Sequence, residues 1–172
     1  GFWIKHGHAE FLRQSGYHVL LFDLNGFGES ESTHMDYPLD ILAAGMFMQQ
    51  RYANLPIGLM GASMGAAMAL CTLSHASHPF KAAVLEAPFA TLLDFWSPYP
   101  LPKLALQASM WLYPSGERRL RPMLAAEKIQ HRPDMLLIYG SVDKFTPVSQ
   151  GHSLMKPLSR TCNAELWQVP CA

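Results

Sequence analysis

The chain has 172 residues, of which 49% are hydrophobic and 15% are charged. This composition excludes an intrinsically disordered chain and fits a single globular domain with a substantial core. The 13 basic and 13 acidic side chains cancel, which argues against nucleic acid or an anionic membrane as the main binding partner. Proline, glycine or charged residues interrupt every apolar run before it reaches the length of a membrane span, so we expect no transmembrane segment.

The three cysteines, Cys71, Cys162 and Cys171, are widely separated and follow no metal-site spacing. An odd number of separated thiols is typical of reduced cysteines, which favours a cytoplasmic location. We therefore expect no bound metal, and no other pattern in the sequence indicates a cofactor. The sequence does not indicate an oligomeric state.

Residues 1–17 predict a loop that runs into a short helix. Phe11 and Leu12 would form part of the buried face of this helix, and Gly16 would end it. The apolar residues 18–22, with the sequence His-Val-Leu-Leu-Phe, predict a buried strand. A turn-rich loop follows this strand.

The next four elements alternate between helix and strand. Residues 36–53 carry apolar side chains at helical spacing. Residues 56–60 form a short apolar run that opens with proline, which is typical of a buried strand. Residues 66–73 are rich in alanine, methionine and leucine, which are strong helix formers. Residues 81–86 predict another short strand.

Residues 88–132 differ in composition from the rest of the chain. Several prolines and aromatic residues are mixed there with short helical patterns. We interpret this stretch as a small helical lid or cap, inserted into a single domain that spans residues 1–172.

The regular alternation resumes after this insertion. Residues 135–139 predict a strand, residues 148–158 a helix broken late by Pro157, and residues 164–169 a final strand. Strands that alternate with helices predict an α/β fold, with a mostly parallel sheet and helices on both faces.

The pattern Gly61-x-Ser63-x-Gly65 lies between the strand predicted at 56–60 and the helix predicted at 66–73. It matches a nucleophile elbow, a sharp turn from strand to helix that exposes a serine hydroxyl. Small residues around the serine let the backbone turn and let the helix pack close to the sheet. The alternative is a Gly-Ser-Gly loop that arose by chance, and the flanking strand and helix count against it.

Three segments, in this order, resemble the α/β-hydrolase family, and the resemblance covers nearly the whole chain. Residues 16–30 are similar to its Gly-Tyr-x-Val … Asp-x-x-Gly-x-Gly-x-Ser segment, and residues 60–67 to its nucleophile elbow. Residues 136–147 are similar to its acid-bearing segment, an apolar strand followed by Gly-x-x-Asp-x-x-x-Pro. Each motif is moderately specific, and together they identify the chain as a member of the family.

The resemblance implies a serine hydrolase whose catalytic triad follows the chain order Ser, Asp, His. Ser63 would be the nucleophile, and the backbone N–H of Met64 would form part of the oxyanion hole. Asp143 would orient the histidine and stabilise its charged form. Glu86, at the end of an earlier strand, is an alternative acid that lacks the Gly-x-x-Asp setting.

A serine nucleophile needs a general base, and none of the eight histidines occupies the expected place. His152 is the only one after Asp143, and it lies in the opening turn of a predicted helix. The family places its histidine after the last strand, so we expect it beyond Ala172. We also expect the oxyanion strand before Gly1, which would leave the chain incomplete at both ends and of very low hydrolytic activity.

The resemblance implies an esterase- or lipase-like reaction on a small-molecule carboxylic ester or thioester, through an acyl-enzyme on Ser63. Phe89, Phe95 and Trp96 of the insertion would line a pocket for an apolar group; alternatively they only pack the insertion's own core. Two other functions stay open, a non-catalytic scaffold that binds small molecules and a peptidase or amidase of the same fold.

Overall fold

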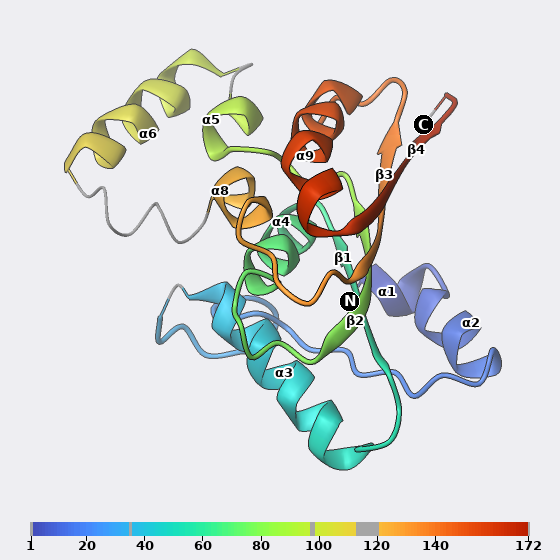
Figure 1. Cartoon of the computed structure of the whole chain (residues 1–172). Coiled ribbons are helices and arrows are strands. Elements are labelled where there is room, and N and C mark those ends of the chain that lie inside the picture. Colours follow the sequence, from blue (N-terminus) through green and yellow to red (C-terminus); the bar gives the residue numbers. More distant parts are fainter. Residues whose placement is uncertain (1, 35, 97–98, 113–120, 172) are drawn as a thin grey trace.

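The computed structural model describes residues 2–34, 36–96, 99–112 and 121–171. In this part of the chain four parallel strands form one sheet in the order β1-β2-β3-β4, so strands that follow one another in the chain also pair (Figure 1). The strands are β1 (Ile57–Ala62), β2 (Phe80–Glu86), β3 (Asp134–Gly140) and β4 (Asn163–Val169).

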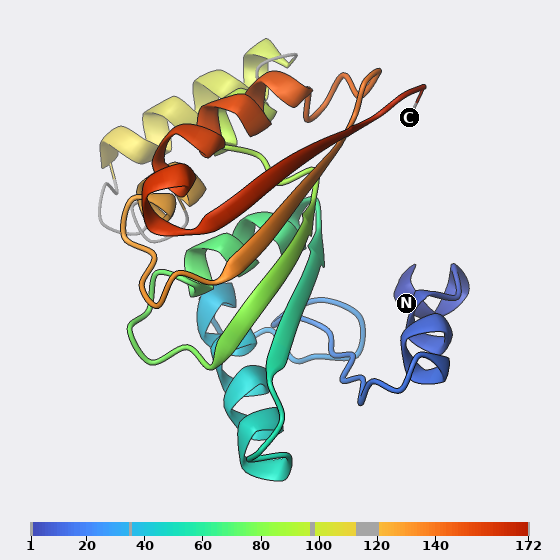
Figure 2. The same cartoon turned by 45° about the vertical axis from the view of Figure 1, so that its right-hand side comes forward.

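Helices lie on both sides of this sheet, as predicted. Helices α3, α4, α8 and α9 form one connected layer against one face, while α1 and α2 lie on the opposite side (Figure 2). Helices α5 and α6 extend away from the layer, at the upper left of Figure 1. The bounds are α1 (Phe2–Lys5), α2 (His8–Gln14), α3 (Tyr37–Arg51), α4 (Met64–Thr72), α5 (Leu92–Phe95), α6 (Pro100–Leu112), α8 (Pro122–Ala126) and α9 (Val148–Thr161).

The sheet buries its two faces to different extents. On the face covered by the helical layer, Leu85, Leu137 and Tyr139 are completely buried. Side chains alternate between the faces along each strand, and on the other face Met60 and Trp167 are 40% and 57% exposed. The hydrophobic core therefore lies between the sheet and the layer of α3, α4, α8 and α9.

Helix α4 is almost completely buried, because its residues 66–72 are small or apolar and pack between the sheet and α3 and α8. The close approach of α4 to β1 depends on Gly61. A Cβ atom at this position would lie 2.8 Å from the backbone nitrogen of Ala66 and from the carbonyl group of Gly65. Glycine is thus required here by space, and the first glycine of the elbow pattern has a physical explanation.

The buried strand predicted at residues 18–22 is wrong. These residues are extended but pair with no strand of the described sheet, in which β1 is an edge strand. Val19 and Phe22 are 36% and 45% exposed, and His18 stacks on Tyr52 with ring centroids 4.1 Å apart. β-Propensity favours an extended backbone, but a strand also needs a neighbour that pairs its N–H and C=O groups.

The helix predicted before this segment forms, but its expected anchoring in the core is wrong. Helix α2 contains no buried residue, and Phe11 is 69% exposed. Its main contacts are with α1. The apolar pattern indicated a helix correctly, whereas the packing partner of its apolar side chains could not be read from the pattern.

Helix α9 continues through Pro157 to Thr161, so the predicted break is also wrong. A proline inside a helix removes one backbone hydrogen bond. The last turn is nevertheless held by the bond from Cys162 N to Leu158 O at 2.7 Å, and by the Thr161 hydroxyl, which donates to Ala126 O at 2.9 Å. Pro157 itself is buried against the core, and this packing compensates for the missing bond.

The predicted insertion, residues 88–132, contains α5, α6 and α8. Helix α8 packs on α4 and α9, whereas α6 packs on α5. The limits of a lid within this stretch stay a prediction. None of the helices in the described ranges is both long and apolar enough to span a bilayer.

Candidate active site

Ser63 joins the end of β1 to the start of α4 in a strained backbone conformation. Its φ of 50° and ψ of −118° are unusual for a residue with a side chain. Two hydrogen bonds hold it there: Ser63 N donates to Glu86 O at 2.8 Å, and Ala67 N donates to Ser63 O at 3.0 Å. The side chain is exposed. The turn therefore presents the hydroxyl to solvent, as a nucleophile elbow does.

The N-terminus of α4 lies directly behind this hydroxyl. The first N–H groups of a helix have no acceptor within the helix, and the helix dipole makes this end positive. Met64 is the first helical residue, and its side chain packs against the core. Its backbone N–H is placed to stabilise a negative oxygen that forms next to Ser63, and the oxyanion role stays a prediction.

Asp143 lies in the loop between β3 and α9. Its Oδ1 accepts hydrogen bonds from the backbone N–H groups of Phe145 and Thr146, at 2.8 and 3.0 Å, and its Oδ2 accepts one from the Thr146 hydroxyl at 2.5 Å. Partial burial raises the pKa of this carboxyl, but the hydrogen bonds outweigh burial and lower it below its ordinary value. Asp143 is therefore a carboxylate at neutral pH, held in one orientation.

The sheet brings Ser63 and Asp143 to the same edge. Ser63 follows β1 and Asp143 follows β3, and the carboxyl ends of parallel strands meet at one edge of the sheet. The bonds from Ser63 N to Glu86 O and from Ala87 N to Ile138 O connect the three strand ends. Since β2 lies between them, the two strand ends are about 10 Å apart, two strand spacings. This gap leaves room for a third group to bridge hydroxyl and carboxylate.

Glu86, the alternative acid, ends β2 with an exposed side chain. It alternates with Leu85, so it points to the side of the sheet away from the helical layer. Its backbone carbonyl, rather than its carboxylate, has a visible role, because it accepts the hydrogen bond from Ser63 N. Among the described residues, no histidine forms a hydrogen bond with this carboxylate.

No histidine of the described chain makes a recorded hydrogen bond with Ser63 or Asp143. His78 and His131 instead connect loops before β2 and β3: His78 Nε2 lies 3.3 Å from Gln130 O, and His131 Nε2 lies 2.8 Å from Ala76 O. Burial lowers the pKa of His78, against the opposing effect of the Gln130 carbonyl. His152, on α9, is exposed.

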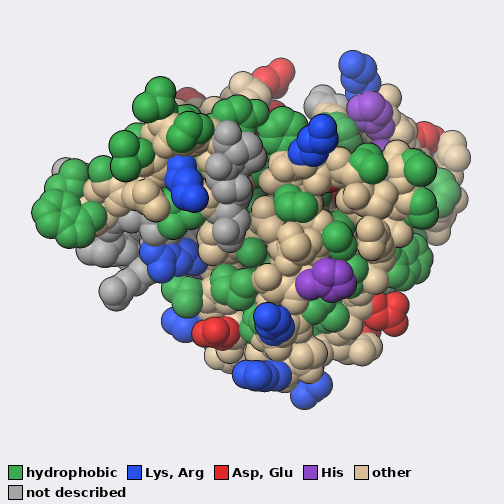
Figure 3. Space-filling model, turned by 90° about the horizontal axis from the view of Figure 1, so that it is seen from above, with side chains coloured by type: hydrophobic (Ala, Val, Ile, Leu, Met, Phe, Trp, Pro, Cys, Tyr) green, Lys and Arg blue, Asp and Glu red, His purple; other side chains and the backbone are tan. Residues whose placement is uncertain are grey.

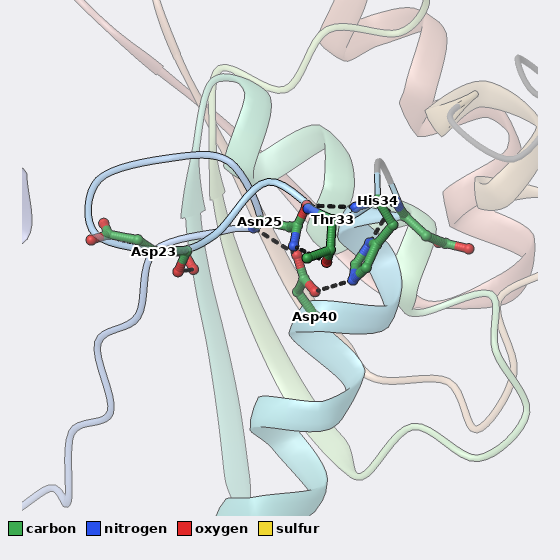
Figure 4. A network of polar contacts seen from close by, with 7 residues as sticks. Asp23, Asn25, Thr33, His34 and Asp40 are labelled. Carbon is green, nitrogen blue, oxygen red and sulfur yellow. Dashed lines mark hydrogen bonds and ion pairs between the residues drawn. The ribbon is translucent and has the colours of Figure 1, made fainter.

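A polar network organises the loop between residues 23 and 36 (Figure 4). Asn25 is its centre: its side-chain oxygen accepts from the N–H groups of Thr33 and His34, and its backbone N–H donates to Asp40 on α3. His34 Nε2 lies 3.6 Å from the Asp40 carboxylate. Sequence reasoning missed Asn25, because an Asn-Gly pair indicates a turn but not partners eight or more residues away.

The three aromatic residues predicted to line a pocket lie together but differ in burial. Phe89 is 2% exposed and belongs to the core, while Phe95 and Trp96 are half-buried. Ring centroids lie 5.5 Å apart for Phe89 and Phe95, and 5.3 Å apart for Phe95 and Trp96. The series continues through Tyr99 to Phe145, two residues after Asp143. Sequence reasoning placed Tyr99 in the aromatic insertion and Phe145 in the acid-bearing segment, but it predicted no contact between them.

A hollow of about 460 Å³ lies elsewhere, between the start of α3, the end of α4 and α8. Its lining includes Pro38, Cys71 and Ala125, and not Ser63 or Asp143. We therefore locate the candidate site from the elbow and the acid loop rather than from the hollow. Within the described ranges, no group of three or more His, Cys, Asp or Glu side chains could hold a metal ion.

Comparisons with known proteins identify a family and relatives of this chain. A family model described as serine aminopeptidase, S33, matches residues 3–135. Human protein ABHD12B is 29% identical in an alignment of 160 residues that covers 85% of this chain and 43% of that protein. A lysophosphatidylserine lipase, ABHD12 from Danio rerio, is 30% identical over 94 residues, 52% of this chain and 25% of that protein. The chain thus spans less than half the length of these relatives.

Solved structures show the same fold. The esterase Pf2001 of Pyrococcus furiosus superposes with a TM-score of 0.75 and 25% identity, covering 98% of this chain and 67% of that one. Rv0554 from Mycobacterium tuberculosis superposes with a TM-score of 0.63 and 18% identity, covering 98% and 77%. A puromycin-hydrolyzing peptidase from the same organism has a TM-score of 0.59 and 18% identity, covering 77% and 21%.

Proposed function

We propose that this chain, which belongs to the S33 serine aminopeptidase family of α/β-hydrolases, hydrolyses carboxylic esters or thioesters through an acyl-enzyme on Ser63. The observation that carries this proposal is the backbone of Ser63. A serine with a φ of 50°, exposed between a strand and a helix N-terminus, is strained, and such strain persists only where the surrounding structure holds it. A nucleophile elbow explains both the strain and the exposure.

The reaction would proceed in two steps. Ser63 Oγ attacks the acyl carbon while a base takes its proton, and the oxygen that becomes negative accepts a hydrogen bond from Met64 N–H. The alcohol or thiol leaves with a proton, and water then releases the acid from Ser63. In this scheme the Asp143 carboxylate orients an imidazole base and stabilises its charged form.

The base would have to reach Asp143 beside the groups that already bind it, and no histidine of the described residues forms a hydrogen bond with this carboxylate. The three hydrogen bonds that Asp143 accepts from Phe145 and Thr146 leave acceptor capacity on its Oδ2, since a carboxylate has about four acceptor sites. An imidazole N–H could occupy that position. The acid loop is therefore compatible with a triad and already holds its carboxylate ionised.

Two comparisons favour an ester over an amide. One relative is named a lysophosphatidylserine lipase, and the superposable structure at 25% identity is an esterase. The aromatic series that starts at Phe89 supports an apolar acyl group. We therefore propose a lipid-like ester as substrate class.

A fluorophosphonate probe tests the nucleophile. Intact-mass spectrometry of the full-length protein should show one covalent adduct, and Ser63→Ala should abolish it. Ser159→Ala, at an exposed serine on α9, is the matched control and should keep the adduct. An adduct that survives Ser63→Ala would contradict the proposal, and no adduct on the unmodified protein would favour the non-catalytic scaffold.

The family description favours one alternative, a peptidase or amidase, because it names an aminopeptidase. A panel of p-nitrophenyl esters beside aminoacyl p-nitroanilides separates the two functions. We expect turnover of the esters by the full-length protein, with a preference for longer acyl chains. Faster turnover of the anilides, with a requirement for a free amino group, would assign the aminopeptidase activity instead.

A further inference from the structure

The chain that leaves β2, residues 86–90, lies between the elbow and the acid loop, and we call it the exit segment. At its start Glu86 O accepts the hydrogen bond from Ser63 N, and Ala87 N donates to Ile138 O, both at 2.8 Å. Ala87 has a φ of 48°, which residues with a side chain seldom adopt. The chain therefore turns sharply directly after the carbonyl that holds Ser63, and the surrounding structure must hold this turn.

The hydroxyl of Tyr139 is one of the groups that hold the exit segment. Tyr139 lies in β3, four residues before Asp143, and its hydroxyl donates to Pro88 O at 2.6 Å. The side chain is completely buried, and burial raises the pKa of the hydroxyl, so the group stays a neutral donor. A phenylalanine would fill the same space in the core. The hydroxyl therefore contributes its hydrogen bond to the exit segment.

The amide of Gln150 holds the other end of the exit segment. Gln150 lies on α9, seven residues after Asp143, and its Oε1 accepts the hydrogen bond from Ala90 N at 2.8 Å. The residue is only 7% exposed. Burial of a polar side chain costs free energy unless the group is hydrogen-bonded. An apolar side chain would serve the packing of α9 equally well, so here too the polar group is used for its bond.

Tyr139 and Gln150 lie on either side of the acid loop in the sequence and belong to one packed unit. The residue after Gln150 is Gly151, and a Cβ atom there would lie 2.5 Å from Cε2 of the Tyr139 ring. Helix α9 therefore contacts this ring directly. The acid loop connects β3 to α9, so its two ends, Tyr139 and Gln150, move together. Both ends are hydrogen-bonded to the segment that holds Ser63.

From this arrangement we propose that Tyr139 and Gln150 are positioning residues, whose hydrogen bonds to the exit segment fix the Ser63 elbow relative to the Asp143 loop. The inference rests on the proposed function, since it concerns the alignment of its nucleophile and its acid. Neither residue acts on the substrate itself. A base that bridges the two groups requires one fixed separation between them, and a misplacement of about 1 Å can slow a reaction about a hundredfold.

The exit segment lies below the molecular surface. Pro88, Phe89 and Ala90 are each no more than 2% exposed. The carboxyl ends of the strands lie at the top of Figure 1, and Figure 3 views the molecule from that side, where hydrophobic and uncharged atoms make up most of the visible surface. Under the proposed function a substrate approaches Ser63 from this side. Removal of the buried polar groups leaves that surface unchanged, so substrate binding should be unaffected.

Variants of the full-length protein that lose one polar group test this inference. Tyr139→Phe removes only the hydroxyl, and Gln150→Met removes the acceptor at a similar side-chain length. We expect each to lower kcat for a p-nitrophenyl ester by about tenfold or more, with KM changed by less than about twofold. The rate of fluorophosphonate labelling of Ser63 should fall to a similar extent.

A buried backbone group needs a partner in any protein, so the control must separate positioning from stability. Thr72→Val is matched to Tyr139→Phe, because the Thr72 hydroxyl is completely buried and donates to Met68 O at 2.9 Å, at the far end of α4 from Ser63. Both variants should lower the midpoint of urea denaturation. Thr72→Val should keep the labelling rate and kcat of the unmodified protein at temperatures where the variants are folded.

Three outcomes would overturn the inference. If Tyr139→Phe and Gln150→Met lower the urea midpoint but label at the rate of the unmodified protein, the two groups serve stability alone, and the proposed function stays in place. A loss that appears in KM rather than in kcat would assign them to substrate binding. A full-length protein that the probe does not label at Ser63 would remove the proposed function, and this inference with it.

Discussion

Helices α9 and α6 are almost equal in length, with 14 and 13 residues, and both have an apolar side. Helix α9 packs Leu154 and Leu158 completely into the core, whereas α6 leaves Leu104 and Trp111 mostly exposed. The difference follows from the connections. Helix α9 joins two neighbouring parallel strands, so the crossover must lie on the sheet. Among the described elements helix α6 lies between α5 and α8 rather than between two strands, so no crossover obliges it to cover the sheet.

An apolar helical stripe therefore has two possible uses in one chain. In α9 it contributes to stability, whereas in α6 it is exposed in the described structure. The first use predicts large effects of substitution on unfolding and the second predicts small ones. Three experiments test which contacts carry the stability of the fold, from the largest expected effect to the smallest.

The largest effect is expected in α9. Leu154→Ala removes a side chain with no exposed area, and we expect a loss of about 2–5 kcal/mol in the free energy of unfolding. Leu104→Ala in α6 should change it by no more than about 0.5 kcal/mol. Urea denaturation measures both. Equal losses at the two positions would show that α6 belongs to the core and would break the comparison.

The second test concerns how closely the helical layer lies on the sheet. Gly61→Ala puts a Cβ 2.8 Å from the backbone of Ala66, which forces α4 away from β1. We therefore expect the free energy of unfolding to fall by about 1–3 kcal/mol. Gly65→Ala is the matched control, because a Cβ there meets nothing within 4 Å; it should be neutral or stabilising by up to about 1 kcal/mol. Gly61→Ala should also slow fluorophosphonate labelling of Ser63, and unchanged labelling would contradict the close-packing requirement.

The smallest effect concerns the loop that leads into α9. The pKa of Asp143 lies below its ordinary value in the folded protein, so the carboxylate contributes stability above its unfolded pKa, and this contribution is lost as the pH falls through the folded pKa. Thr146→Val removes the hydroxyl donor and should lower the free energy of unfolding by about 1 kcal/mol at neutral pH. The pKa of Asp143, followed by NMR, should rise.

The cost of Thr146→Val should shrink as the solution becomes acidic enough to protonate Asp143. Thr161→Val is the control, because the Thr161 hydroxyl donates to the neutral carbonyl of Ala126. The stability lost in Thr161→Val should therefore not depend on pH in this range. A cost for Thr146→Val that is constant down to acid pH would show that the hydroxyl does not favour the charged form of Asp143.

Much of the fold could be predicted from local patterns. The four strands of the sheet and the helices α3, α4 and α9 all form where apolar periodicity placed them, within a few residues at each end. The predicted α/β-hydrolase family is confirmed by the match over residues 3–135. These predictions succeed because periodicity and propensity act within a few neighbouring residues.

The errors have a different origin. Residues 18–22 have the composition of a strand but pair with none, and α2 has an apolar side that packs on no core. Pro157 stays within α9 because packing and two capping hydrogen bonds outweigh one lost bond. In each case the presence or absence of packing against residues distant in the sequence contributes to the outcome, and local patterns carry no information about it.

For the candidate site, the sequence by itself determined the elbow, because Gly61-x-Ser63-x-Gly65 between a strand and a helix specifies a turn through local sterics alone. Only the tertiary structure decided that β2 separates Ser63 from Asp143, that Glu86 contributes its carbonyl, and that the stripe of α6 is exposed. Strand order and helix placement are set by packing across the whole chain. The spacing of apolar side chains within one helix does not indicate which surface will cover them.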